Sequence, residues 1–310
     1  MSIVNDRKRA CETLWEKDWI AVILIYLVLT EVFPQVMAMI TPNTAGTLLT
    51  CLAIGDMASM VTVFNEPGAT ASLCCTIVLI FFTAVTGFGL HFWALGLVRE
   101  QKVTTETLFE GFGNVGAILM ASLMRVTCMA IWLMLISFAS ALPVSLLSIV
   151  VTSIGISEEL VIYGFMGLVM WVGTILISWR YCLLPFCYYD APTLWPNRLV
   201  RQSTQLMLGQ YKRLFSLYLS FWRYYLVHVL CALFAWVLVH LDLLLSVQEI
   251  TMEQFAQEVF TLSMGPAMAS LLFVVQLVVS VFLLPKLMVA LAAFYEECKM
   301  KCANSPQIEN

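Results

Sequence analysis

Charged residues are scarce in this chain. Asp, Glu, Lys and Arg together make up only 12% of its 310 residues, whereas about a quarter of a soluble globular domain is charged. Hydrophobic residues account for 61%. A chain this apolar is not an ordinary soluble domain, and its composition predicts a membrane protein that crosses the bilayer several times.

Positive charge is missing from three stretches, 41–70, 140–160 and 240–265, which carry acids only. The sixteen Lys and Arg residues lie at the opposite ends of the hydrophobic segments or inside these segments. Basic residues collect on the cytoplasmic side of membrane proteins. We therefore predict a membrane protein whose basic ends face the cytoplasm. The net charge of -4 is a sum over both sides and implies no nucleic-acid partner.

The length of the hydrophobic segments predicts the number of crossings. A bilayer core of about 30 Å takes roughly 20 helical residues per crossing. Six segments are long enough: 19–40, 71–98, 114–138, 160–184, 214–239 and 267–292. Six crossings put both termini in the cytoplasm. The expected fold is an all-α polytopic helix bundle, with a cytoplasmic segment at 1–18, a six-span membrane domain at 19–297 and a cytoplasmic tail at 298–310.

Two further apolar stretches, 45–63 and 140–156, are not counted as crossings. Counting both would export Arg99 and Lys102, against the charge bias. We interpret both stretches as interfacial or re-entrant elements on the outer side, a reading that Pro143 in the second stretch favours.

The inner connections are expected to contain short amphipathic helices. Thr107 and Glu110 have the spacing of a capping box ahead of the third segment. Trp195-Pro196 begins a second such helix, because proline is favoured at the first helical position, and Leu199 and Leu206 give it an apolar face.

No catalytic motif in the sequence has the neighbouring residues or the structural context that its chemistry requires. The stretch from Gly111 to Gly116 spells G-x-G-x-x-G, but it opens a membrane segment instead of following a strand. Glu158-Glu159 resembles the paired glutamates of intramembrane prenyl-protein proteases, yet Tyr163 stands where these proteases have Arg. The histidines have no metal-ligand spacing. The sequence therefore predicts no catalytic residues, no metal and no cofactor.

Five ionisable residues interrupt otherwise apolar segments: Glu31, Arg125, Arg180, Arg223 and Lys286. Each charge of this kind costs at least about 2.5 kcal/mol at the bilayer centre. Counted from the inner ends of their segments, Glu31, Arg125 and Arg223 lie roughly 14 to 18 Å along their helices, and we predict that all five residues share one charged layer. The alternative is that the basic side chains snorkel to the inner headgroups.

The four bases face one acid, so such a layer carries a net positive charge. An unpaired buried charge is costly, and an anionic ligand would neutralise it. We predict an anionic lipid headgroup from the inner leaflet, held by Arg125 and Arg223, with Glu31 orienting one of the two guanidinium groups.

A recognisable run of residues leads into the fifth segment. It reads Ser203-x-x-Leu206-Met207-x-Gly209, then Leu214-Phe215, Leu217 and Leu219-Ser220-Phe221. This run resembles the signature of a bacterial family of six-helix integral membrane proteins, domain-of-unknown-function family nine hundred and seventy-five. Leu108 to Phe112 and Phe294-Tyr295-Glu296 are similar to that family too, whereas Tyr224 stands where the family usually has Trp.

The resemblance covers residues from about 85 to 297 and implies a six-helix fold in the bacterial cytoplasmic membrane, but it brings no assigned activity. The chain is also distantly similar to the membrane domain that accompanies glycerophosphodiester phosphodiesterases, which points toward lipid surroundings.

Two functions fit these observations. The first is a non-enzymatic protein that handles or binds an anionic lipid or small molecule, as a transporter or an accessory subunit. The second is a structural or regulatory partner of another membrane complex. The expected partners are membrane lipids, anionic ones included, and either another membrane protein or further copies of the chain. A cavity lined by the charged layer would favour the first function.

The predicted topology is testable with reporter fusions. Fusions near residues 105, 205 and 305 should read as cytoplasmic, and fusions near 65, 150 and 250 as external, because the basic ends stay inside. One exchanged pair would overturn the six-span arrangement.

Overall fold

The computed structural model describes residues 19–40, 67–154, 158–239 and 266–304, together with isolated positions between 44 and 65. It is 90% helical, and the described part contains no strand. The predicted all-α fold is therefore confirmed for these residues. The apolar stretch 45–63 lies almost entirely outside the described residues.

The helices follow the predicted segments closely. They are α2 (Trp19–Leu27), α3 (Phe33–Ile40), α6 (Ala69–Val98), α7 (Val115–Ile154), α8 (Glu158–Arg180), α9 (Leu184–Asp190), α10 (Pro196–Met207), α11 (Tyr211–Ser220), α12 (Trp222–Val239) and α15 (Pro266–Asn304). A π-helical turn, η1 (Val28–Val32), joins α2 to α3, and a 3-10 helix, η2 (Thr105–Asn114), precedes α7.

Five helical stretches among the described residues are long and apolar enough to cross a membrane: Trp19–Met37, Ala69–Val98, Thr105–Ser145, Phe165–Asp190 and Leu272–Cys302. An all-α multi-pass membrane bundle requires such helices. The remaining expected segment, 214–239, is divided into α11 and α12 at Phe221. Its crossing, and with it the count of six spans, stays a prediction.

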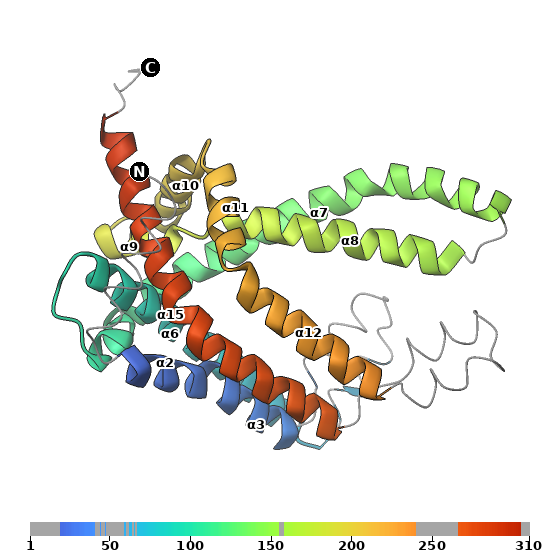
Figure 1. Cartoon of the computed structure of the whole chain (residues 1–310), viewed down its shortest axis with the longest axis horizontal. Helices are drawn as coiled ribbons and strands as arrows, with labels where there is room; N and C mark the ends of the chain where they lie inside the picture. Colours follow the sequence, from blue (N-terminus) through green and yellow to red (C-terminus); the bar gives the residue numbers. More distant parts are fainter. Residues whose placement is uncertain are drawn as a thin grey trace.

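The helices form two arms that diverge from a common end (Figure 1). One arm is the antiparallel pair α7 and α8, and the other contains α2, α3, α12 and α15. Helix α15 lies between α2 and α12 and contacts both. The short elements η2, α9, α10 and α11 lie near the end where the arms meet.

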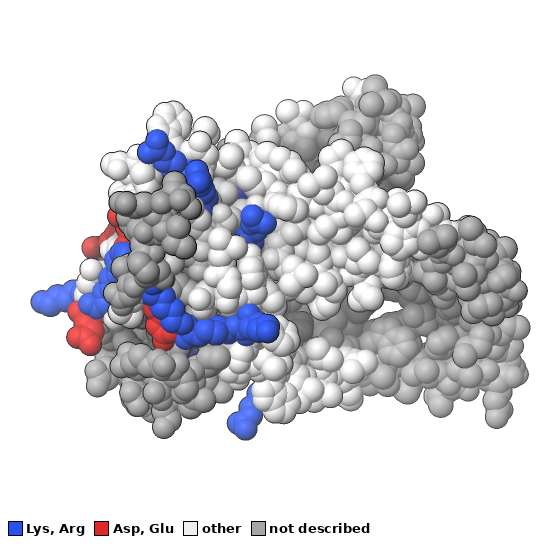
Figure 2. Space-filling view, turned by 90° about the horizontal axis from the view of Figure 1, so that it is seen from above, with Lys and Arg blue, Asp and Glu red and all other residues white. Residues whose placement is uncertain are grey.

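Charged side chains gather near this common end. Figure 2 shows Lys, Arg, Asp and Glu concentrated in one half of the visible face, the side on which η2, α9 and α10 lie in Figure 1. Most of the other described surface on this face carries no charge. The arrangement brings together the basic segment ends that the sequence places on one side of a membrane.

A cluster of ion pairs ties three distant chain segments together at this end. Arg99 lies 2.7 Å from Asp190 and 2.5 Å from Glu296. Lys299 also contacts Asp190, at 2.6 Å, and the Tyr295 hydroxyl donates to the same carboxylate at 2.7 Å. We call these five residues the Asp190 cluster. Burial alone would lower the pKa of Arg99, but the two carboxylates raise it above its ordinary value.

A close approach of backbones joins α6 to η2. A Cβ atom on Gly89 would lie 1.8 Å from the carbonyl oxygen of Leu108, far inside van der Waals contact. The Leu108 side chain is fully buried. Glycine at position 89 therefore allows η2 to lie directly on α6.

The structure corrects the interpretation of 140–156. Helix α7 continues through Pro143 to Ile154, and its 40 residues make it about 60 Å long. The stretch up to Ile154 is thus the C-terminal part of α7 and not a separate interfacial or re-entrant element. A continuous helix satisfies its own backbone hydrogen bonds, which an irregular loop in an apolar setting does not.

The short helices predicted before the third and fifth segments are present, with one correction. Helix α10 begins at Pro196, as predicted from Trp195-Pro196, and buries Leu199 and Leu206. The element before α7 is a 3-10 helix, and its capping box joins Thr104 to Thr107 instead of Thr107 to Glu110. The predicted boundary between membrane domain and tail falls inside α15, where Cys298 is buried.

Two glycines in α6, Gly87 and Gly89, provide a matched test of the close contact between α6 and η2. Gly89→Ala should lower the free energy of unfolding by about 2 to 3 kcal/mol, because η2 must move away from α6. Gly87→Ala meets open space and should raise the unfolding free energy by about 0.5 to 1 kcal/mol, since alanine is the better helix former. Denaturant titration in mixed micelles measures both. Equal effects would contradict the close contact between Gly89 and Leu108.

The Asp190 cluster predicts a second stability difference. Asp190→Asn removes the shared negative charge and should cost about 2 kcal/mol, less than a fully buried pair because the site is partly exposed. Glu106→Gln replaces an exposed carboxylate and should stay within about 0.5 kcal/mol of the wild type. The same titration compares them, and an Asp190 variant as stable as the control would show that the cluster contributes nothing.

Candidate anion-binding site

Arg180 is the last residue of α8. A cation is favoured there because the free carbonyl groups at a helix C-terminus carry partial negative charge. The Arg180 guanidinium carbon lies 5.1 Å from the centroid of the Trp132 ring on α7, a cation–π contact. The hydroxyl of Ser203 on α10 donates to the Arg180 carbonyl oxygen at 3.4 Å. These contacts fix where α8 ends.

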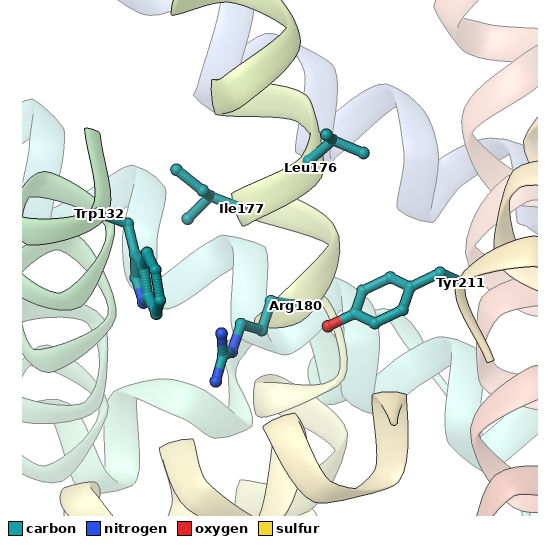
Figure 3. A pocket seen from close by; sticks show the side chains of 5 residues that line it. All are labelled: Trp132, Leu176, Ile177, Arg180 and Tyr211. Carbon is teal, nitrogen blue, oxygen red and sulfur yellow. The ribbon is translucent and has the colours of Figure 1, made fainter. Parts of the chain in front are cut away.

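A pocket of about 280 Å³ surrounds this arginine. Trp132, Leu176, Ile177, Arg180 and Tyr211 line it, and they come from α7, α8 and α11. Figure 3 shows the Arg180 guanidinium between the Trp132 ring and the Tyr211 hydroxyl. Leu176 is 52% exposed and Trp132 39% exposed, so the pocket is open at the protein surface. It combines hydrogen-bond donors with an apolar wall.

Arg125 lies two helical turns before Trp132 and therefore on the same face of α7. Its side chain is half-buried, and its electrostatic neighbours are His91 of α6, Tyr218 of α11 and Cys182 in the turn after α8. It forms no hydrogen bond or ion pair with another described residue. None of its neighbours supplies a negative charge that would compensate the guanidinium.

Aromatic packing continues the pocket toward Arg125. The Tyr218 ring stacks on Trp179 of α8 with centroids 5.8 Å apart. Tyr211 and Tyr218 are two turns apart on α11, so both face the same way. Arg125 and Trp132 are two turns apart on α7 as well. Around the end of α8 we group Arg125, Trp132, Arg180, Tyr211 and Tyr218, and we call this set of side chains with the pocket between them the α7–α11 groove.

The other three predicted residues have different surroundings. The Lys286 ammonium donates to the Tyr224 hydroxyl at 2.7 Å and lies 5.3 Å from the centroid of that ring. Arg223 is exposed in the first turn of α12, and Glu31 is exposed in η1. Among the described residues, Glu31 forms no ion pair with any of the four bases.

The structure therefore does not join the five charges in one network. Arg180 lines the pocket, and Arg125 lies on the same face of α7 as the pocket residue Trp132. Lys286 lies against α12, and Arg223 and Glu31 are exposed on the other arm. The predicted grasp of one headgroup by Arg125 and Arg223, with Glu31 as a third partner, has no contact between these side chains to support it.

Sequence reasoning missed several residues of the groove. Trp132, Tyr211 and Tyr218 are not among the residues that the sequence predicts for the site. The helical spacing of Trp132 from Arg125, and of Tyr218 from Tyr211, was the available signal. His91 and Cys182 carried none, because their proximity to Arg125 arises from the packing of separate helices.

The chemistry of the groove suits binding better than catalysis. Two guanidinium groups and two tyrosine hydroxyls are donors that can hold an anion. His91 points its Nδ1 atom at the Gly87 carbonyl oxygen, 2.6 Å away. Within the described ranges, no three His, Cys, Asp or Glu side chains are arranged to hold a metal ion.

Comparison of the chain with family models, curated proteins and solved structures finds no match. The resemblance of residues 85–297 to the six-helix family stays a prediction.

Proposed function

We propose that this protein binds an anionic amphiphile, a lipid with a phosphate headgroup, in the α7–α11 groove. The observation that carries the proposal is the guanidinium of Arg125, which forms no described hydrogen bond or ion pair. It lies on the same face of α7 as Trp132, whose ring contacts Arg180 at an open pocket. A half-buried cation in an apolar helix is costly without a counter-ion. A phosphate supplies the charge and accepts hydrogen bonds from both guanidinium groups.

The wall of the pocket distinguishes a lipid from a free anion. Leu176, Ile177 and Trp132 give the groove an apolar side, along which an acyl chain would lie next to the exposed faces of α7 and α8. Inorganic phosphate has no group for this surface. In the orientation that the charge distribution predicts, the end of α8 belongs to the cytoplasmic half of the membrane, so the lipid would come from the inner leaflet.

The protein need not act on this lipid chemically. The donors around Arg125 and Arg180 hold an anion, and none of the described groove residues is a carboxylate poised as a general base. The proposal is therefore a lipid-handling membrane protein, either a transporter or the lipid-binding subunit of a larger complex. The competing role of a purely structural partner predicts no retained lipid.

Native mass spectrometry of the detergent-purified protein tests this proposal. The wild type should retain phosphatidylglycerol and not phosphatidylcholine, and Arg125→Gln or Arg180→Gln should weaken retention at least about tenfold, since each removes a charge-assisted hydrogen bond. The double variant should retain none. Arg198→Gln, which removes an exposed charge from α10, serves as the matched control and should bind like the wild type.

Two outcomes would reject or revise the proposal. If the wild type retains no more anionic lipid than the double variant, the site does not exist. If inorganic phosphate displaces the lipid completely at equal concentration, the apolar wall contributes nothing and the ligand is a free anion instead.

A further inference from the structure

Glu31 lies on the exposed face of the first helical segment, where most of the other exposed side chains are apolar and suited to contact with lipid. Ile20 and Leu24 in α2 and Val28 at the start of η1 are exposed and recur every four residues, so they form one apolar stripe. Glu31 follows this stripe in η1, and its side chain is exposed as well. A carboxylate that faces hydrocarbon is unfavourable, and among the described residues no base neutralises it.

The local backbone fixes this position. Phe33 donates its N–H to the Val28 carbonyl oxygen, which is the wider spacing of a π-helical turn. Pro34 has no N–H to give to the Thr30 carbonyl, so the regular α-helical ladder cannot continue through Glu31. Gln35 is also exposed one turn later. Polar side chains at such positions in membrane helices commonly bond to another helix.

Arg223 lies on the other side of α15 from Glu31 and is an exposed base with no described acid beside it. It is exposed in the first turn of α12 and has no described hydrogen-bond or ion-pair partner. Trp222 and Leu226 beside it are exposed too. Helix α15 lies between α2 and α12 (Figure 1) and presents its own exposed row of Val274, Val278 and Phe282.

We infer that the face formed by α2, α15 and α12 is the interface of a symmetric dimer, in which Glu31 of each copy pairs with Arg223 of the other. A two-fold axis near α15 exchanges the flanking helices, so an acid on one side and a base on the other are self-complementary. The α15 rows then meet close to the axis, and both charges lose their exposure to lipid by the same contact.

A second copy fits this face better than a lipid does. An anionic headgroup would suit Arg223 but would be repelled by Glu31, and a cationic partner would show the reverse preference. The chain itself carries both charges on the two flanks of one helix. The arrangement uses neither Arg125 nor Arg180, so it stands or falls independently of the proposed lipid site.

Single-molecule photobleaching of the full chain, with one fluorescent protein at its C-terminus, tests the dimer. Reconstitution in pure phosphatidylcholine vesicles at low protein density excludes bridging by anionic lipid. The wild type should bleach in two steps. Glu31→Lys or Arg223→Glu should raise the dissociation constant at least about tenfold, and the double variant, which restores opposite charges, should recover the dimer.

Glu106→Lys and Lys212→Glu reverse exposed charges elsewhere and should leave the dimer intact. The inference is overturned if the wild type is monomeric at every protein density, which needs no variant to fold. It is equally overturned if the single reversals leave the dimer fraction unchanged or if the double variant stays monomeric.

Discussion

The carboxylate of Asp190 holds together parts of the chain that hydrophobic packing alone would leave free to slide. It receives Arg99 from the end of α6, and Lys299 and Tyr295 from the end of α15. Lipid-facing helices have little hydrophobic preference for one neighbour over another, since lipid tails are as apolar as leucine. An ion-pair cluster has a defined geometry and therefore sets the register of these helices.

The position of the α7–α11 groove depends on the Asp190 cluster. Helix α9 begins four residues after Arg180 and ends at Asp190, and its Phe186 stacks on Tyr295 with centroids 5.4 Å apart. Fixing Asp190 thereby fixes α9 and the turn that ends α8. Arg180 is thus held over Trp132, and Cys182 is held near Arg125.

The charges inside the membrane segments are accommodated in different ways. Lys286 has a neutral partner in Tyr224, and Arg180 has an aromatic face and a helix C-terminus. Arg125 has neither. Charged residues that look alike in the sequence thus have different surroundings in the fold, and Arg125 is the one whose environment does least to compensate its charge.

Hydropathy and charge bias predicted the helical segments well, because a segment of about 20 apolar residues has few alternatives to a helix in a bilayer. The start of α10 was predictable from Trp195-Pro196 for a similarly local reason. The extension of α7 past Pro143 was not, since proline more often ends a helix than continues one. The Asp190 cluster was not predictable either, because it joins residues far apart in the chain.

The candidate site shows the same division between local and tertiary information. Arg125 and Arg180 were identified as charges in apolar segments, which is a property of the sequence. The prediction that they share one layer with Glu31, Arg223 and Lys286 requires straight helices that all begin at the same depth in the membrane. The π-helical turn at η1, the end of α8 at Arg180 and the break at Phe221 each violate that assumption.

The break at Phe221 connects the two regions for which we propose binding. Its side chain is buried at the junction of α11 and α12. On one side of this junction, α11 carries Tyr211 and Tyr218 to the groove, and on the other, α12 begins with Trp222 and Arg223. One packed ring thus sets the angle between the helix that lines the pocket and the helix that borders the α15 face. Because a well-packed side chain resists displacement, a shift of α12 at its exposed face must either deform the packing around Phe221 or carry α11 with it.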